Sequence, residues 1–381
     1  MIHPRDGERG IALIMVLLVV TLLTILVMEF TYTVEVESHI SRNSLNALQA
    51  TYLARSGINI LAGALIEDDD PTVDPGEDDK WRYFALGPCQ NILENEISVP
   101  PTWKLCGRIV DESGKVNVNF SRPPAQSVVQ KNQGQAQGQP TNECKPNTPG
   151  TASYCWRDVL VQLASGSGLD TNVLKDALDS YWASPPPPKL GQPALVVADE
   201  FDSLEDVAAS FPALQDRSVF DGLRKHVTAL RTAQTAAAQK KTLNINTVPA
   251  NVLQAIFTVM EIDEGAVGDI IARRTEAPFK NPGEAFQSID NKAGALQMFG
   301  VKSNLFRLEA SAVVNGVGKT VRVLVRRDSI PPPKNSPDGT AGYRITFLDW
   351  QKESGVGAAR DAAADEEQGL EAGGNSAKDQ S

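Results

Sequence analysis

The hydrophobic pattern is most continuous near the N-terminus, where residues 11–28 read IALIMVLLVVTLLTILVM without a charged side chain. An apolar run of about 18 residues is long enough to span a bilayer as a helix. A secretory signal peptide has a shorter apolar region, roughly 7–15 residues, and small residues at a cleavage site after it. Here Glu29-Phe30-Thr31 follows the run. The pattern therefore favours a retained transmembrane helix over a cleaved signal peptide.

The helical pattern continues beyond this run, because residues 30–66 contain no proline. Apolar residues recur there at helical spacing: Leu45, Leu48, Tyr52, Leu53, Ile60 and Ala64. We predict one helix over residues 11–66, roughly 80 Å long at about 1.5 Å per residue. Since about 30 Å suffices to cross a bilayer, the remainder must pack on a domain or on neighbouring subunits. Arg5 and Arg9 precede the run, so the positive-inside rule predicts a cytoplasmic N-terminus.

The rest of the chain alternates between strand-like and helix-like periods. Strands are predicted at 103–110, 115–120, 305–314, 320–326 and 343–348. Helices are predicted at 156–163, 171–183 and 203–210, with Thr171 and Ser203 as N-caps, and in a second helical unit over 249–299. Asn315-Gly316-Val317-Gly318 predicts a hairpin between two of the strands.

Two segments lack the residues needed for a core: the Gln-, Asn-, Pro- and Gly-rich stretch 121–150, predicted to be a flexible loop, and the acidic tail 351–381, predicted to be disordered. The prolines 185–188 predict a further loop, and the Ala-rich stretch 232–240 links to the second helical unit. The order of helix, strands, helical insert and strands predicts an α+β fold. The pattern does not show whether the strands on the two sides of the insert share one sheet.

Composition narrows the range of functions. The 381 residues carry a net charge of −11, which disfavours nucleic acid as a partner because phosphates would be repelled. Gly318-Lys319-Thr320 resembles the end of a phosphate-binding loop, but Val313 stands where that motif needs glycine. No pattern typical of a catalytic nucleophile or a catalytic metal is present, so we predict that the chain is not an enzyme.

The four cysteines, Cys89, Cys106, Cys144 and Cys155, show no C-x-x-C spacing. Zinc and thioredoxin-like sites are therefore poorly supported. If the chain is exported, the simplest arrangement is two disulfides between sequence neighbours, Cys89–Cys106 and Cys144–Cys155. Free buried thiols are the alternative.

The N-terminus resembles a type IV prepilin signal, because a basic leader ending in Arg9-Gly10 abuts the apolar run at Ile11. The resemblance implies cleavage between Gly10 and Ile11 by prepilin peptidase and methylation of the new amino terminus on Ile11. Most pilins and pseudopilins carry glutamate at the fifth mature position, which is Met15 here. A buried carboxylate needs a positive partner, which a neighbour's terminal amine supplies in such filaments. Absence of this glutamate is typical of the K subunit family of type II secretion.

Two stretches of the body also resemble that family, general secretion pathway protein K. They are DESGKVNVN, with Asn117 and Asn119, and LNINTVP, with Asn244, Asn246, Thr247 and Pro249. The resemblance implies a long pilin-like helix, a small antiparallel sheet and a large helical insert of two SAM-like, helix-hairpin-helix-like units. It divides the chain into a leader (1–10), an N-terminal helix (11–66, transmembrane over 11–28), a first set of pilin-like strands (67–120), a first SAM-like unit with a flexible loop (121–235), a second unit (240–300), a second set of strands (301–350) and a disordered acidic tail (351–381).

The function that this resemblance implies is a minor pseudopilin that caps or initiates a periplasmic pseudopilus. Its partners would be the I and J pseudopilins, prepilin peptidase and the inner membrane, with the bulk of the chain in the periplasm. Two alternatives remain: a membrane-anchored helix-hairpin-helix DNA-uptake receptor, and a minor pilin of a type IV pilus. The hairpin at 261–265 would present three carboxylates to phosphates, which counts against DNA.

Calcium is a candidate ligand rather than a required cofactor. Members of the protein K family can carry calcium in the helical domain, and calcium takes six to eight oxygen ligands. The acidic residues that could supply them here are Asp199, Glu200, Asp202 and Glu205. Solvated surface charge is the alternative interpretation, since no EF-hand spacing is present.

Overall fold

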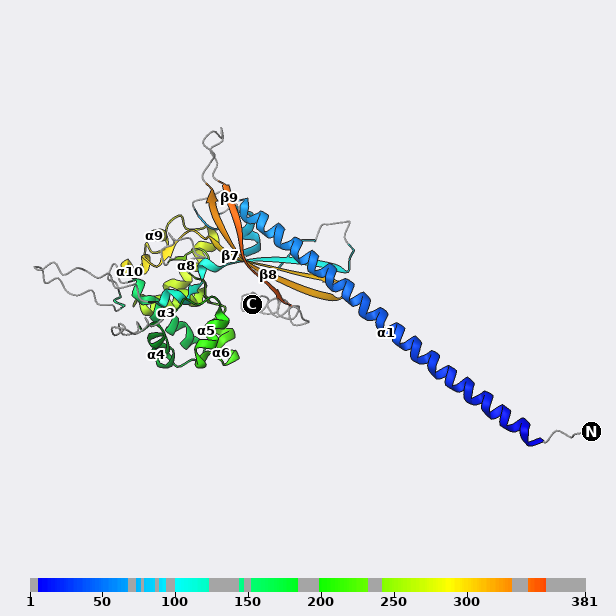
Figure 1. The fold of residues 1–381 in the computed structure, drawn as a ribbon. Coiled ribbons are helices and arrows are strands. Elements are labelled where there is room, and N and C mark those ends of the chain that lie inside the picture. Colours follow the sequence, from blue (N-terminus) through cyan, green and yellow to red (C-terminus); the bar gives the residue numbers. More distant parts are fainter. Residues whose placement is uncertain are drawn as a thin grey trace, which may run out of the picture.

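The computed structural model begins with a single long helix, α1 (Asp6–Ile66), which contains both Gly10 and Ile11. The structure describes residues 6–67, 73–76, 79–85, 89–93, 100–122, 144–146, 152–183, 199–231, 242–330 and 342–353. The N-terminal part of α1 extends far beyond the rest of the molecule (Figure 1). Within the described residues one helix is apolar and long enough to cross a membrane, and its most apolar window is wholly exposed in the isolated chain.

One antiparallel sheet unites strands from both ends of the chain, which the sequence pattern left open. It consists of β1 (Gln90–Asn91), β2 (Trp103–Asp111), β7 (Leu305–Val314), β8 (Val317–Ile330) and β9 (Gly342–Glu353). The strand order is β1-β2-β7-β8-β9. Strand β2 pairs with β7 over its whole length, from Trp103 opposite Val314 to Asp111 opposite Phe306. The helical insert is therefore a long excursion between two neighbouring strands of the sheet.

The hairpin between β7 and β8 is tighter than predicted. Val314 pairs directly with Val317, so Asn315 and Gly316 alone form the turn. Both residues have positive φ, 49° and 85°, as a two-residue hairpin turn of this kind requires. Strand β8 therefore starts before the predicted Thr320. Strand β9 runs to Glu353, so the first three residues of the predicted tail belong to the sheet.

Helix α1 packs across the sheet with one face of its C-terminal half. The residues that it buries are Ala50, Ala54, Ile58, Leu61 and Leu65. Gly57 lies among them, and a Cβ there would stand 3.0 Å from the Cβ of Ala310 and from a methyl carbon of Leu105. Small residues thus allow the helix to approach the strands closely. Of the residues whose spacing predicted the helix, Leu45, Leu48, Tyr52 and Ile60 are exposed.

The helical insert begins after β2 and returns at β7. Its elements are η1 (Glu112–Gly114), β3 (Val116–Asn117), η2 (Val118–Ser121), α3 (Ala152–Gly166), α4 (Thr171–Trp182), α5 (Leu204–Ser210), η3 (Pro212–Leu214), α6 (Arg217–Leu223), β4 (Val227–Thr228), β5 (Leu243–Asn244), α7 (Ala250–Val259), α8 (Ala266–Glu276), α9 (Pro282–Ala285), α10 (Ala293–Leu296) and β6 (Phe299–Gly300). Buried residues of both predicted units, such as Trp156 and Phe257, belong to one hydrophobic core. A short helix, α2 (Lys80–Ala85), instead joins the core between α1 and the sheet through Trp81.

Two local predictions in the insert are wrong. The strand expected at 115–120 is limited to Val116–Asn117, because the chain turns into the 3-10 helix η2. The N-cap of α4 is Asp170, whose carboxylate accepts a hydrogen bond from the Asn172 amide, rather than Thr171. The predicted cap at Ser203 is correct, since its hydroxyl accepts the Asp206 amide at 3.1 Å.

The cysteines form two disulfides in the structure, Cys89–Cys106 and Cys144–Cys155. The first ties the chain just before β1 to β2, and the second fixes a short segment to the buried start of α3. Residues 123–143, 184–198, 232–241 and 354–381 lie outside the described residues, and with them most of the predicted flexible loop, the proline loop, the Ala-rich link and most of the predicted tail.

Candidate assembly surface and interdomain junction

Among the described side chains, the most exposed apolar surface lies on α1 between Leu13 and Tyr32. Its large apolar side chains from Leu13 to Met28 are between 52% and 69% exposed, and Phe30 and Tyr32 are each 71% exposed. Met15 lies in this surface at 66% exposure. A contiguous apolar surface of this size is not stable in water, so a bilayer or neighbouring helices must cover it.

An apolar stripe continues along the second half of α1. Leu45, Leu48 and Tyr52 are exposed, and their positions place them opposite the face that packs on the sheet. This half of the helix therefore has one face in the core of its own chain and another free for a second helix. The extra helix length predicted from the sequence serves both purposes.

The first asparagine motif fixes the start of the helical insert. The side-chain oxygen of Asn117 accepts the Asn119 amide, and its side-chain amide donates to the Leu230 carbonyl at 2.8 Å. Asn119 pairs with the backbone of Phe201: its oxygen accepts the Phe201 amide and its nitrogen donates to the Phe201 carbonyl. Both asparagines are buried, so these bonds satisfy groups that water cannot reach.

The second motif repeats this arrangement. The oxygen of Asn244 accepts the Asn246 amide at 3.0 Å. The side chain of Asn246 pairs with both the amide and the carbonyl of Phe279. Each motif also opens a short parallel strand pair, β3 with β4 and β5 with β6. The two halves of the insert therefore share the same Asn-x-Asn hydrogen-bond arrangement.

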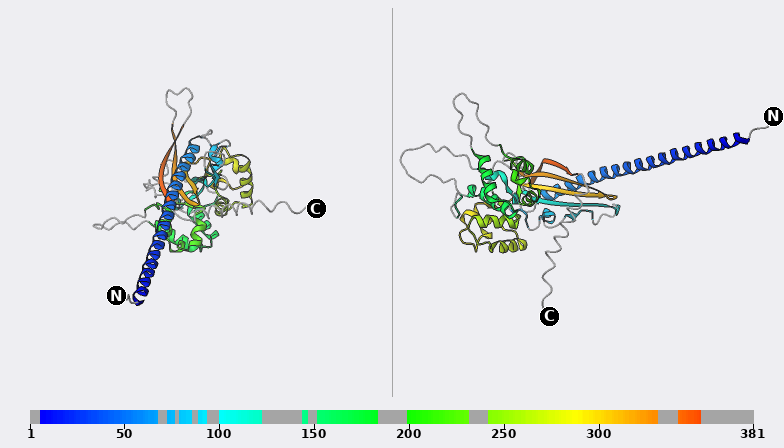
Figure 2. Two further views of the ribbon diagram at one scale, coloured as in Figure 1. Left: turned by 90° about the vertical axis from the view of Figure 1, so that its right-hand side faces the viewer. Right: turned by 90° about the horizontal axis from the view of Figure 1, so that it is seen from below.

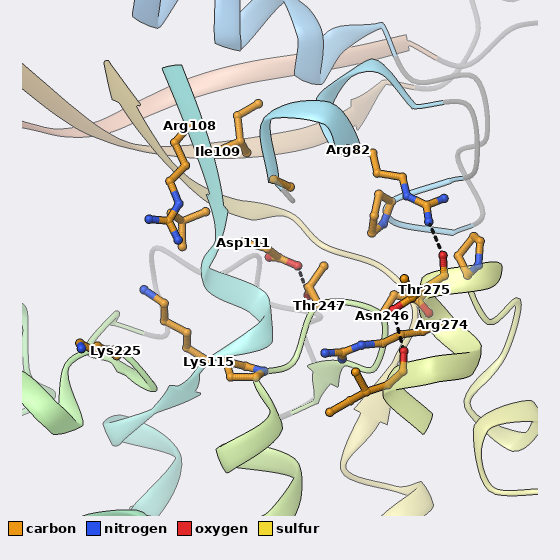
Figure 3. Close-up of a pocket in the computed structure, with 16 residues that line it drawn as sticks. Arg82, Arg108, Ile109, Asp111, Lys115, Lys225, Asn246, Thr247, Arg274 and Thr275 are labelled. Carbon is orange, nitrogen blue, oxygen red and sulfur yellow. Dashed lines mark hydrogen bonds between the residues drawn. The ribbon is translucent and has the colours of Figure 1, made fainter. Parts of the chain in front are cut away.

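The two motifs meet the sheet at a buried polar cluster. The Asp111 carboxylate at the end of β2 accepts a hydrogen bond from the hydroxyl of Thr247 (Figure 3). It also accepts one from the hydroxyl of Ser303. Asn244 donates to the Ser303 hydroxyl at 2.7 Å and to the Asp74 carbonyl at 2.6 Å. Pro249, the last residue of the second motif, is the N-cap of α7. The cluster joins the sheet to the insert.

A buried ion pair completes the cluster. Asp74 contacts the guanidinium of Arg327 on β8 and accepts the Ser303 amide at 2.8 Å. The Arg327 guanidinium also lies 4.4 Å from the ring centre of Tyr343 and 5.1 Å from that of Phe306. Arg327 is 3% exposed, so its charge depends on these contacts rather than on water.

Burial shifts the ionisation of the two aspartates in the cluster. Burial raises the pKa of Asp111, and the hydroxyls of Ser303 and Thr247 oppose the shift only partly. Burial also raises the pKa of Asp74, with the Arg327 charge acting in the opposite direction. The Asp111 charge further raises the Asp74 pKa, because two carboxylates share one site.

The neighbouring Glu112 behaves in the opposite way. Its burial alone would raise the pKa, but the charges of Lys115 and Arg307 lower it to about 2. Lys115 and Arg307 lie 3.0 Å and 2.9 Å from its carboxylate. Glu112 is therefore a stable anion at the turn after β2.

Replacing Asp111 with asparagine should change how stability depends on pH. An acid whose pKa is raised by folding stabilises the folded state below its ordinary pKa of about 3.9, and this stabilisation is lost as pH rises through the raised value. Wild-type stability should therefore fall relative to Asp111→Asn as the pH rises above about 4 and through the raised pKa of Asp111. Thermal unfolding of the detergent-solubilised chain measures this difference. The exposed Asp176→Asn serves as the matched control, and parallel curves for wild type and Asp111→Asn would contradict the assignment.

The acidic residues considered for calcium do not converge. Asp199 and Asp202 both contact Arg231, and Glu200 lies 3.9 Å from Arg122. Glu205 stands in the first turn of α5. Within the described ranges no group of three or more His, Cys, Asp or Glu side chains has an arrangement that could hold a metal ion.

The hairpin between α7 and α8 is arranged around its own carboxylates. Glu264 accepts hydrogen bonds from Gln254 and Thr258, and Asp263 accepts the Gly265 amide at 3.0 Å. In a DNA-binding hairpin the backbone amides must be available to phosphates. Here the Gly265 amide already donates a hydrogen bond to the Asp263 carboxylate, which agrees with the sequence argument against DNA.

Three residues of the polar cluster were missed by the sequence analysis. Asp74, Ser303 and Arg327 lie far apart in sequence, and no motif links them. One signal was available in the sequence of β8. Every second side chain of a strand lies on the same face, and Arg327 follows Val323 and Val325, which are buried, in this alternation. A charged residue on the buried face of a strand indicates a buried ion pair.

The comparisons with known proteins bear on the insert and on the fold. No curated protein matches the chain. Residues 243–302 match the family model of type II secretion system (T2SS), protein K. The matched segment begins at β5, contains the second asparagine motif and ends just before Ser303 of the polar cluster.

The structure is similar to a chain in the crystal structure of the GspK-GspI-GspJ complex from the enterotoxigenic Escherichia coli type 2 secretion system. The TM-score is 0.51 at 14% sequence identity, and the match covers 83% of this chain and 99% of the other. At this identity the match shows a shared fold. The pilin-like helix and sheet with a helical insert, expected from the sequence, is thereby confirmed.

Proposed function

We propose that this chain is the K-type minor pseudopilin of a type II secretion system and that it caps or initiates the periplasmic pseudopilus. The observation that carries the proposal is the protein K match over residues 243–302, because it falls on the helical insert rather than on the pilin-like part. The insert is what distinguishes the chain from a simple pilin. The similarity to a chain of the GspK-GspI-GspJ complex supports the same assignment.

The proposed partners are the I and J pseudopilins, which would pack against α1. The exposed apolar side chains from Leu13 to Met28 and the stripe at Leu45, Leu48 and Tyr52 supply a surface of the right kind. Packing of apolar helix faces excludes water or lipid without requiring charged partners. The buried opposite face of α1 keeps the helix rigidly joined to its own sheet.

A place at the tip is supported by the shape of the molecule. The helical insert lies at the end of the sheet away from the N-terminus in Figures 1 and 2. A further subunit stacked above would meet this insert instead of an open helix bundle. Met15 agrees with the same position, because a subunit with no neighbour above has no terminal amine to neutralise a buried glutamate.

The proposed location is the inner membrane, with the N-terminus in the cytoplasm and the bulk in the periplasm. Arg5 and Arg9 support this orientation. The two disulfides agree with it, since such bonds persist in oxidising compartments.

Processing of the N-terminus tests the pseudopilin class. In cells that contain prepilin peptidase, we expect the membrane-extracted chain to begin at Ile11 with one added methyl group, because Arg9-Gly10 abuts the apolar helix. Intact mass and N-terminal sequencing measure this, and a strain without the peptidase is the control. A chain that still begins at Met1 in the presence of the peptidase, or that begins beyond Met28, would refute the proposal.

A further inference from the structure

A cleft of about 320 Å³ opens between β2 and the helical insert. Residues of the α2 region, the end of β2, the second asparagine motif and α8 line it (Figure 3). Its charged lining residues among those described are Arg82, Arg108, Lys115, Lys225, Arg274 and Asp111. The cleft thus contains five basic side chains and one carboxyl group.

This concentration of positive charge contrasts with the rest of the chain, whose net charge is −11. The single carboxyl, Asp111, is buried and bonded to hydroxyls, and burial raises its pKa. It therefore neutralises the basic residues poorly, and of these Lys115 is instead paired with Glu112. Like charges gathered in a concave, partly desolvated site repel each other and create a field that attracts anions.

Arg274 is the basic group most in need of a counter-ion. Its guanidinium donates to the carbonyls of Ile245 and Val248 at 3.0 Å and 2.7 Å, and no carboxylate of the described residues pairs with it. Burial lowers its pKa to about 10. Two carbonyls leave part of the guanidinium fork free for a further acceptor, and a planar carboxylate fits that geometry.

The opposite wall of the cleft is also electropositive. Lys225 is exposed and makes no ion pair within the described part of the chain, whereas Lys115 is bonded to Glu112 at 3.0 Å. Burial, followed by the charges of Lys225 and Lys115, lowers the pKa of the adjacent His226. Figure 3 places Lys115 and Lys225 on one side of the cleft and Arg274 on the other, so a ligand between them would meet positive charge from both walls.

We propose that this cleft binds an acidic peptide segment, whose carboxylates bridge Arg274 on one wall and Lys225 on the other. The size of the cleft suits a few side chains rather than a folded surface or a nucleic-acid duplex. The occupant is the chain's own C-terminal region, which carries Asp361, Asp365, Glu366, Glu367 and Glu371. This region follows β9 over 28 further residues, which in extended form span about 90 Å, roughly twice the length of the 14-residue strand β8. Its acidic side chains complement the basic lining of the cleft.

The first experiment measures the cleft directly with a fluorescent peptide of residues 361–371, DAAADEEQGLE. Anisotropy is recorded with the full-length chain in detergent at low salt. Lys225→Glu should weaken binding roughly tenfold, whereas Lys175→Glu, an equal charge change on the exposed surface of α4, should not. Circular dichroism verifies that both variants are folded. Added salt should also weaken binding, since the contacts are between charges.

Three results would overturn the proposal. They are equal binding by the two lysine variants, equal binding of a peptide whose acids are replaced by their amides, and tighter binding of a single-stranded oligonucleotide than of the peptide.

The second experiment tests the occupant, using the full-length chain with Asp365→Asn, Glu366→Gln and Glu367→Gln. Because its C-terminal region has lost three acidic side chains, this variant should bind the free peptide more tightly than wild type. Equal binding would overturn the assignment to the chain's own C-terminal region and would leave the cleft to an acidic segment of another protein. Neither result depends on the proposed role in secretion.

Discussion

Replacing Arg327 with methionine should destabilise the folded chain by about 3–5 kcal/mol, because it leaves the buried Asp74 without its positive partner. Methionine fills much of the same volume, so the loss is electrostatic rather than a cavity. The same substitution removes the contacts of the guanidinium with the rings of Tyr343 and Phe306. Because Asp74 also binds the Ser303 amide, the damage should spread to the junction between sheet and insert.

The neighbouring Arg326 supplies the matched control. Its side chain is 23% exposed and pairs with Asp328 at 2.9 Å, and partly exposed ion pairs of this kind contribute about 0–1 kcal/mol. Denaturant titration of Arg327→Met and Arg326→Met, followed by tryptophan fluorescence, compares them. Trp81 lies beside Arg327 and reports on the cluster directly. Equal stability of the two variants would show that the buried pair does not hold the junction.

Replacing Met15 with glutamate should strongly reduce secretion if the chain occupies the tip. The carboxylate would lie in an apolar surface with no terminal amine above it. Placing such a charge at the centre of a membrane costs about 2.5–3.5 kcal/mol, and less toward the interface. The variant should therefore insert or assemble less well than wild type.

Met15→Leu is the control, since it preserves size and apolarity and should secrete normally. The measurement is the amount of secreted protein and of pseudopilus in cells that carry only the variant chain. Improved assembly with Met15→Glu would mean that a neighbour's amine does pair with this position. The chain would then be a repeating subunit and not the tip.

Much of the fold could be predicted from local signals. The apolar run predicted α1, the Asn-Gly pair predicted the β7–β8 hairpin, and Ser203 predicted the start of α5. Each of these depends on residues close together in sequence. The two asparagine motifs were also identified, although the sequence could not reveal that both perform the same task, with Asn119 and Asn246 each holding the backbone of a distant phenylalanine.

What could not be predicted depends on distant contacts. The face of α1 that packs on the sheet combines small residues around Gly57 with Ile58 and Leu61, and which face it is depends on contacts with distant strands. The strand expected over 115–120 ends early because Asn117 and Asn119 bind backbone groups of the insert. The pairing of Asp74 with Arg327 joins positions that no local pattern connects.

The composition of the assembled tip tests most directly whether this chain caps the pseudopilus as a single K-type subunit. The full-length chain is co-expressed with the I- and J-type pseudopilins and the prepilin peptidase of the same organism. Complexes are extracted with detergent, and native mass spectrometry measures their masses. A complex with one copy each of this chain, the I subunit and the J subunit is the predicted result. Filaments containing many copies of this chain, or a chain that binds neither subunit, would contradict it.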